Sequence, residues 1–273
     1  MTDAKLEFKL RKLKSYIKEL GSVAVAFSAG VDSTFLLKVA HEVLGDKVVA
    51  VTANTSSFTE QELQEATLFC QKYGIVHVIC EIDNLSLPEF ANNAVDRCYH
   101  CKKMIFNEVK TYAITHGFNA VVEGANKDDE ADFRPGHRAI EELKIESPLR
   151  MASLTKEEIR TLARTMGLEV WKKPSCACLA SRFVYGESIT RKKLKMVECA
   201  EQYLSEIGCT QYRVRMHGMM ARIEIMPEDF SLLLQEDTRI QLIADMHKLG
   251  FQYVSLDLMG FRTGSMNEAL LIK

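Results

Sequence analysis

Two sets of residues in this 273-residue sequence could do chemistry: a serine- and aspartate-bearing glycine turn, and eight cysteines. The turn reads Ser28-Ala29-Gly30-Val31-Asp32-Ser33. Gly30 lets the backbone turn tightly, serine hydroxyls can donate to phosphate oxygens, and the free N–H groups of a following helix favour an anion. The turn lacks a Walker A lysine and is not G-x-G-x-x-G, so it indicates neither a P-loop kinase nor a nicotinamide enzyme. The alternative is a plain helix cap by Asp32 or Ser33.

Four of the cysteines form two tight pairs. Cys98 and Cys101 make a C-x-x-C beside the start of a predicted helix, a spacing at which two thiolates can meet one metal or cluster. A structural zinc site, a redox pair and two unrelated buried cysteines are the alternatives. Cys176 and Cys178 lie in an aperiodic segment. The other four follow helical or strand patterns and are expected to be core residues: Cys70, Cys80, Cys199 and Cys209.

The elements around the glycine turn predict a doubly wound parallel α/β sheet. A helix with apolar residues at helical spacing, 6–17, precedes a buried strand at 23–27, and the turn then leads into an apolar helix. Further strands are predicted at 47–53, 75–80, 119–123 and 168–171, with helices at 59–73, 102–116 and 155–166. Such sheets bind ligands beyond the carboxyl ends of their strands, which is where the turn lies.

The pattern changes after Trp171. Residues 172–186 have no periodicity and carry Pro174, so we predict a domain of residues 1–175 and a smaller α+β domain of residues 176–273. The second domain is expected to contain helices at 190–207 and 228–248 and strands at 210–216, 220–226 and 251–257. On its first strand Arg213 and Arg215 alternate, which puts both guanidiniums on one face, suited to a nucleotide phosphate. A solvated strand face is the alternative.

The glycine turn resembles the S-G-G-x-D-S signature of the PP-loop ATP pyrophosphatases, with Ala29 in place of one glycine. In that family ATP is cleaved between its α and β phosphates and AMP is transferred to an acyl or carbonyl oxygen. The resemblance implies that the loop at 52–54, after the second strand, borders the adenosine. The implied cofactors are ATP and Mg²⁺, with Asp32 beside the Mg²⁺. The implied ATP-binding residues are Ser28, Gly30, Val31, Asp32, Ser33, Thr52, Gly124 and Asp129.

Six further segments resemble the LarE family of ATP-dependent sulfur transferases, in family order along nearly the whole chain. They are residues 98–103, 123–129, 134–136, 147–149, 177–182 and 257–267. The resemblance implies a small nucleotide substrate, a pyridinium biscarboxylic acid mononucleotide, whose carboxylates are adenylated and converted to thiocarboxylates for the nickel-pincer nucleotide cofactor of lactate racemase. The substrate phosphate is expected to meet Ser181, Arg182, Arg213, Arg215, Glu201 and Glu224.

The family has two sulfur sources, a sacrificed cysteine and a cluster held by three cysteines. The C-x-x-C pair indicates the cluster type, so the resemblance implies a [4Fe-4S] cluster on Cys98, Cys101 and Cys178. Cys176 could replace Cys178 as ligand or act as a sacrificial donor, so both are candidate catalytic residues. The family also suggests a homo-oligomer and other proteins of nickel-pincer nucleotide biosynthesis as partners.

Charge and hydropathy limit the other classes. The chain carries 35 Lys and Arg against 37 Asp and Glu, a net charge of -2, which argues against a nucleic-acid partner. No apolar run approaches the roughly 20 residues of a membrane helix and no signal core precedes the first charged stretch, so we expect a cytoplasmic protein. Two other functions remain open: a tRNA thiolase of the same superfamily, and a non-catalytic adenine-nucleotide-binding protein with a structural zinc.

Overall fold

A computed structural model describes residues 4–131, 136–174 and 177–268. The chain divides into two compact units. Unit 1 comprises Met1–Leu87 and Asp96–Cys176, and unit 2 comprises Pro88–Val95 and Ala177–Lys273. The short stretch 88–95 therefore belongs with the C-terminal residues, although it lies within the N-terminal half of the sequence.

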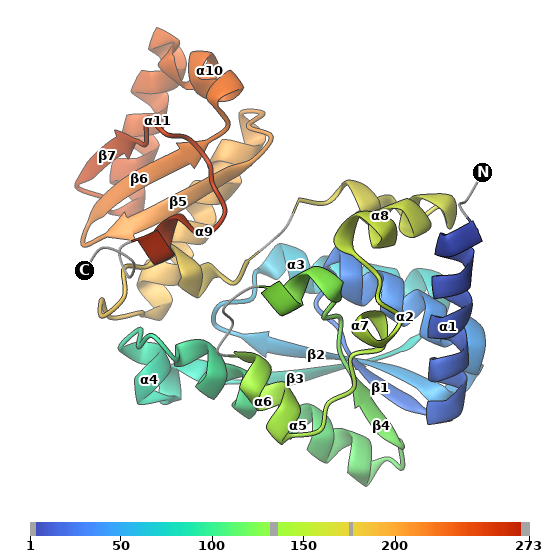
Figure 1. The fold of residues 1–273 in the computed structure, drawn as a ribbon. Coiled ribbons are helices and arrows are strands. Elements are labelled where there is room, and N and C mark those ends of the chain that lie inside the picture. Colours follow the sequence, from blue (N-terminus) through green and yellow to red (C-terminus); the bar gives the residue numbers. More distant parts are fainter. Residues whose placement is uncertain (1–3, 132–135, 175–176, 269–273) are drawn as a thin grey trace. The chain divides into compact units, whose positions relative to one another are not determined.

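Unit 1 is built on a parallel sheet of four strands in the order β3-β2-β1-β4 (Figure 1). The strands are β1 Val23–Ala26, β2 Val48–Thr55, β3 Val76–Ile82 and β4 Ala120–Val122. Val23 is in register with Val48 on one side and Ala120 on the other. The chain thus adds β2 and β3 on one side of β1 and then β4 on the other. The predicted doubly wound α/β fold is confirmed.

Helices cover both faces of this sheet because the inner strands are apolar on both sides. The first face packs against α1 Ala4–Leu20, α2 Val31–Leu44, α3 Glu60–Tyr73 and α8 Lys156–Thr165. The second face packs against α5 Arg97–Thr115 and α6 Gly136–Glu142. Val25 faces the first core and Ala24 the second, as the two-residue period of a strand requires. A short helix, α7 Pro148–Met151, precedes α8.

The strand order creates a switch point at the carboxyl ends of β1 and β4. The connection from β1 leads towards β2, whereas β4 lies on the opposite side of β1. Neighbouring connections diverge there, and open α/β sheets bind ligands at such a point. Residues 28–33 follow the end of β1, and Gly124 follows the end of β4.

A strand and a helix start predicted for unit 1 differ from the structure. Residues 168–171, predicted as a strand, lie in or beside the 3₁₀ helix Glu169–Lys172, where Leu168 is buried and Trp171 packs on the first core. The place beside β4 is instead taken by an isolated parallel bridge between Val122 and Glu146. The helix predicted at 102–116 begins earlier, at Arg97, so the C-x-x-C pair lies inside the helix.

Unit 2 contains a three-stranded sheet in the order β5-β6-β7. Strands β5 Tyr212–His217 and β6 Met220–Ile225 are antiparallel, and β7 Tyr253–Leu256 is parallel to β6. Its helices are α4 Pro88–Ala91, α9 Arg191–Glu206, α10 Phe230–Leu234 and α11 Glu236–Leu249. The single helix predicted at 228–248 is therefore broken at Gln235. Among the described residues, none of the helices is long and apolar enough to cross a membrane.

Candidate functional site

The glycine turn forms an uncapped helix start at the switch point. Gly30 is the N-cap of α2 and makes no side-chain cap hydrogen bond to the first N–H groups of that helix. The Ser33 hydroxyl instead stabilises the turn: it lies 3.1 Å from Ser28 Oγ and accepts from the Ser28 N–H at 3.3 Å. Ser33 therefore satisfies a backbone donor within the turn, and the N-cap of α2 is Gly30, not Asp32 or Ser33. N–H groups at a helix start favour an anion, so this turn is compatible with the predicted phosphate site.

Ala29 takes a conformation that its family signature assigns to glycine. Its φ is +52°, in the left-handed region, and the residue is buried. A non-glycine residue in this region costs about 1–2 kcal/mol. Lys173 supports the strained peptide by donating to the Ala29 carbonyl oxygen at 3.2 Å, and its ammonium also pairs with Glu65.

Asp32 has one engaged and one open carboxylate oxygen. Oδ2 forms an ion pair with Lys156 of α8, whereas Oδ1 is buried without a well-formed hydrogen bond among the described residues, although the nearby Asn126 side chain helps to lower the pKa of this carboxyl. Burial raises the pKa of Asp32, and the Lys156 ammonium opposes that rise. A buried oxygen without a partner, beside a phosphate-binding turn, fits a Mg²⁺ ligand.

Gly124, just beyond β4, lets the second strand end approach the glycine turn. A Cβ at this position would lie 3.0 Å from Ser33 N and 3.3 Å from Asp32 Cβ. Such contacts are tighter than a Cβ normally makes, so a side chain here would push the start of α2 away. Gly124 therefore fixes the distance between β4 and the start of α2.

Two acids shape the loop after β4: Glu123, directly before Gly124, and Asp129, further along the loop. Asp129 accepts from the Asn126 N–H at 2.9 Å. The buried Glu123 accepts from Ser147 Oγ at 2.5 Å and from the Ala125 N–H at 3.0 Å, and burial raises its pKa. Both carboxylates thus hold the loop in which Asp129 is predicted to border ATP.

Thr52 lies inside the protein and not on a loop. Strand β2 continues to Thr55, so the prediction that residues 52–54 form a loop after the strand is wrong. The fully buried Thr52 hydroxyl donates to the Phe27 carbonyl oxygen at 2.9 Å and lies 2.8 Å from His77 Nε2. It therefore braces the end of β1 from which the glycine turn departs.

The predicted cluster ligands occupy both units. Cys98 and Cys101 lie one helical turn apart on α5, the first exposed and the second buried. Cys178 is exposed and directly precedes the 3₁₀ helix Leu179–Arg182 of unit 2. Cys176 lies outside the described residues, as do positions 134 and 135 of one family segment. Within the described chain, no group of three or more potential metal ligands comes together.

The two thiols on α5 nevertheless suit a thiolate-bound metal. Residues three apart on a helix are neighbours on its surface, which is the arrangement that C-x-x-C metal and cluster sites use. The four cysteines predicted as core divide evenly. Cys70 and Cys209 are buried, and burial raises their pKa to about 12 and about 11, whereas Cys80 and Cys199 are only partly buried.

In unit 2 the predicted phosphate-binding residues form one buried charge network. Arg182 grips Glu201 with two parallel bonds, Nε to Oε1 at 2.8 Å and Nη2 to Oε2 at 2.9 Å. Its remaining Nη1 donates to Ser181 Oγ and to the carbonyl oxygens of Ala177 and Cys178. Arg182 therefore ties the Cys178 backbone to α9, which carries Glu201.

The strand arginines continue this network. Arg215 pairs with Glu224 of β6 at 2.9 Å and donates to the Ser181 carbonyl oxygen at 3.1 Å. Arg213 lies opposite Glu224 in the strand register, and its guanidinium stacks over the Phe261 ring at 5.3 Å. Arg213 and Arg215 are only 7% and 5% exposed, so the solvated-face alternative is wrong.

Burial and neighbouring charges shift the pKa of Glu201 in opposite directions. Burial alone raises its pKa, but Arg182, Arg213 and the Val214 N–H outweigh burial and hold the pKa below its ordinary value. The carboxylate is thus charged wherever the unit is folded near neutral pH. A desolvated, fixed set of charges of this kind recognises an anion with little reorganisation.

Sequence reasoning missed three residues of these sites. Lys156 and Lys173 contact the glycine turn, and Ser265 donates to Glu224 Oε1 at 2.7 Å. In the sequence, nothing distinguishes these two lysines from solvated surface lysines, because they lie more than 120 positions from the turn and only the fold brings them to it. Ser265 lies within the family segment 257–267, which was the one signal that could have found it.

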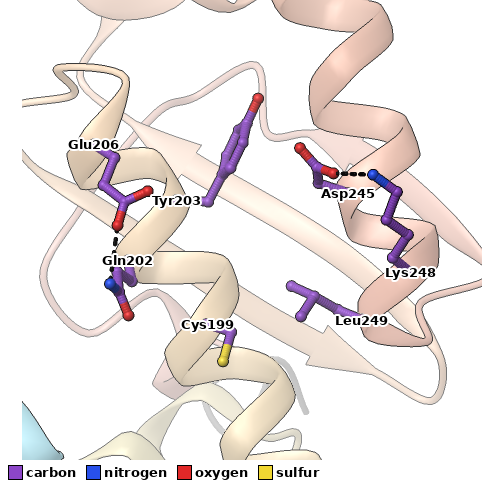
Figure 2. A pocket seen from close by; sticks show the side chains of 7 residues that line it. All are labelled: Cys199, Gln202, Tyr203, Glu206, Asp245, Lys248 and Leu249. Atoms are coloured by element: carbon purple, nitrogen blue, oxygen red, sulfur yellow. Dashed lines mark hydrogen bonds and ion pairs between the residues drawn. The ribbon is translucent and has the colours of Figure 1, made fainter.

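A surface pocket in unit 2 lies apart from all predicted residues. It occupies about 320 Å³ between α9 and α11 (Figure 2). Its lining includes Cys199, Tyr203 and Leu249, with an Asp245–Lys248 ion pair at 2.8 Å on one wall. None of the residues predicted to bind ATP, substrate or metal lines this pocket.

Comparisons with known proteins agree with this geometry. The family model described as NAD synthase matches residues 6–188. An uncharacterised protein of Synechocystis is 40% identical over 97% of this chain and 99% of its own length. The pyridinium-3,5-bisthiocarboxylic acid mononucleotide synthase of Lactiplantibacillus plantarum is 39% identical over 98% of this chain and 96% of its own length.

A more distant relative covers only part of the chain. The tRNA-specific 2-thiouridylase of Rickettsia conorii is 26% identical over 56% of this chain and 51% of its own length. By contrast, the relatives from Synechocystis and Lactiplantibacillus plantarum match nearly the whole chain, and neither is named as a tRNA enzyme. Together with the uncapped turn at the switch point, they show that this chain belongs to the NAD synthase (PP-loop) family and, within it, to the LarE family of sulfur transferases.

Proposed function

We propose that this protein is an ATP-dependent sulfurtransferase that replaces carboxylate oxygen by sulfur in pyridinium-3,5-biscarboxylic acid mononucleotide. The observation that carries the proposal is that one chain has both an uncapped glycine turn, in unit 1, and a buried arginine network, in unit 2. The first suits ATP and the second suits a substrate phosphate. The full-length relative from Lactiplantibacillus plantarum is named for the corresponding thiocarboxylate product.

The ATP half of the reaction uses the glycine turn. The open N–H groups of α2 and the Ser28 and Ser33 hydroxyls would hold the β and γ phosphates, while Asp32 would hold Mg²⁺ through its open Oδ1. Mg²⁺ would supply charge neutralisation at the phosphates. A substrate carboxylate oxygen then attacks the α-phosphorus, pyrophosphate leaves, and an acyl-adenylate forms.

The sulfur half uses the cysteines. Cys98, Cys101 and Cys178 would hold a [4Fe-4S] cluster, which would supply the sulfur to be transferred. Arg182 fixes the Cys178 backbone through its carbonyl oxygen, and Cys178 is exposed to solvent. Sulfur then replaces AMP at the acyl carbon, and AMP is a far better leaving group than hydroxide. Cys176 remains the alternative third ligand or sacrificial donor.

The substrate phosphate would be met in unit 2. Three guanidiniums, those of Arg182, Arg213 and Arg215, face the two carboxylates of Glu201 and Glu224. Arg222 also pairs with Glu224 and with Asp257, so the substrate phosphate would meet a desolvated cluster of fixed guanidiniums and carboxylates. Ser181 would add a hydroxyl donor. A tRNA substrate would instead need an extended basic surface, and the net charge of -2 argues against one.

The family resemblance adds three proposals: a homo-oligomer, a cytoplasmic location, and action together with other proteins of nickel-pincer nucleotide biosynthesis. Unit 1 would act as the ATP pyrophosphatase domain, and unit 2 would bind substrate and contribute to oligomer contacts.

Anaerobic iron and acid-labile sulfide analysis tests the cysteine roles. Cys98→Ser and Cys101→Ser should each lose the cluster, and only one of Cys176→Ser and Cys178→Ser should do so. Cys199→Ser, at a cysteine outside the predicted site, is the matched control and should keep full iron content. An unchanged iron content in Cys98→Ser and Cys101→Ser would overturn the proposed ligand set.

A further inference from the structure

Asn84 is a buried polar residue that none of the predicted roles uses. It begins the 3₁₀ helix Asn84–Ser86, shortly after β3, and its side chain is fully buried. The side chain spans three elements at the carboxyl edge of the sheet. It contacts Ser56 and Ser57 beyond the end of β2 and Cys101 on α5.

The contacts of Asn84 fix which way its amide points. The Ser56 N–H, 3.3 Å away, can only donate, so the Asn84 atom that faces it must be the carbonyl Oδ1. The Ser56 hydroxyl donates to the same oxygen at 2.5 Å. The amide nitrogen must then face the other way, where it donates to Ser57 Oγ at 3.2 Å and to Cys101 Sγ at 3.8 Å.

We propose that Asn84 is a positioning residue for the thiolate site on α5, holding and polarising the Cys101 sulfur by an N–H···S hydrogen bond. The inference rests on the proposed role of Cys101 as a metal ligand. Residues that hydrogen-bond to a ligand fix its orientation, and their loss typically weakens metal binding about 10–100-fold. Asn84 also anchors the ligand to the ends of β2 and β3, so the sulfur is fixed at the edge where ATP is expected.

A hydrogen bond to sulfur has a second effect on an iron–sulfur cluster. Reduction adds negative charge, which is spread over the cluster and its thiolates, and an N–H donor stabilises that charge. Asn84 therefore raises the reduction potential of a cluster bound through Cys101. A residue that only braces the fold, without an N–H donor to sulfur, would not stabilise that charge directly.

Cobalt(II) titration of the reduced, metal-free, full-length protein tests the inference, with the thiolate-to-cobalt absorption as the signal. Asn84→Leu should weaken Co²⁺ binding about tenfold or more. Ser57→Ala is the matched control, because it removes the other acceptor of the same amide without touching the sulfur. It should bind Co²⁺ as the wild type does. Asn84→Ala serves as a second variant if the leucine prevents folding, and circular dichroism reports folding in each case.

The outcomes separate this inference from the proposed function. Equal Co²⁺ affinity in Asn84→Leu and wild type would overturn the role of Asn84 alone, as would equal losses in Asn84→Leu and Ser57→Ala. A cobalt signal that persists in both the Cys98→Ser and the Cys101→Ser variants would overturn the ligand roles and the inference together. In the reconstituted cluster form, Asn84→Leu should have a lower reduction potential than Ser57→Ala, and equal potentials would contradict the proposal.

Discussion

Arg182 and Glu201 form a two-bond ion pair in the interior of unit 2, with Nε–Oε1 at 2.8 Å and Nη2–Oε2 at 2.9 Å. The arginine side chain is only 3% exposed, so neither charge can be satisfied by water if the other is removed. Because Arg182 also binds the Cys178 carbonyl oxygen, this pair links the predicted phosphate site to a predicted sulfur site.

Glu201→Gln should destabilise unit 2 by about 3–5 kcal/mol, since it leaves a buried guanidinium without its counter-charge. Urea unfolding followed by circular dichroism measures the loss. Glu268→Gln, which breaks the exposed pair with Arg262, is the control and should change stability little. Equal stability of the Glu201→Gln protein and the control would show that the buried pair is not needed.

Acid should destabilise the wild type more than the Glu201→Gln variant. The folded pKa of Glu201 lies below its ordinary value, so its stabilising effect is complete above the unfolded pKa and is lost as pH falls through the folded pKa. The stability difference between the two proteins should therefore shrink below the ordinary range of glutamate pKa values. Unfolding curves across that acidic range measure it, and a constant difference would contradict the assigned charge state.

Gly124→Ala should reduce AMP formation about 100-fold, because its Cβ would displace the start of α2 that holds the phosphates. Gly117→Ala is the matched control. Unlike Gly124, Gly117 has a positive φ of +74°, so an alanine there carries a backbone cost, but its Cβ would meet nothing within 4 Å. The control should lose about 1–2 kcal/mol of stability and keep its ATP turnover. Similar AMP rates in both variants would contradict the role given to Gly124.

Ala29→Gly should keep ATP turnover and be no less stable than the wild type. The left-handed φ of +52° costs alanine about 1–2 kcal/mol that glycine does not lose, and the greater freedom of glycine in the unfolded chain offsets about 0.4–1 kcal/mol of that gain. Ala29→Val, with a branched Cβ at the same backbone angle, should be destabilised and lose AMP formation. Thermal unfolding and an AMP assay test both, and a tolerated valine would show that the strain is not real.

Asp32→Asn should abolish Mg²⁺-dependent AMP formation, since the amide cannot offer a charged oxygen at the open Oδ1 position. Asp128→Asn is the control, because Asp128 Oδ2 accepts from the exposed Lys156 N–H at 2.8 Å and an amide oxygen can keep that bond. Initial rates at several Mg²⁺ concentrations make the comparison. Retained activity in Asp32→Asn would show that residues other than Asp32 hold Mg²⁺.

Local sequence patterns were sufficient for the sheet, the glycine turn and the paired strand arginines. Apolar strand runs separated by amphipathic helices leave few topologies, and alternation placed Arg213 and Arg215 on one face. They failed at residues 168–171, where a short apolar run is equally compatible with a buried 3₁₀ turn. They also failed for Lys156, Lys173 and Asn84, whose roles come from contacts with distant segments and leave no local signature.

The most direct test of the central claim is anaerobic incubation of the full-length protein with ATP, Mg²⁺ and pyridinium-3,5-biscarboxylic acid mononucleotide, followed by mass spectrometry. We predict AMP, pyrophosphate and a product in which sulfur replaces a carboxylate oxygen, all absent with Asp32→Asn. ATP left uncleaved in the presence of this substrate, or AMP formed without any sulfur in the product, would contradict the claim.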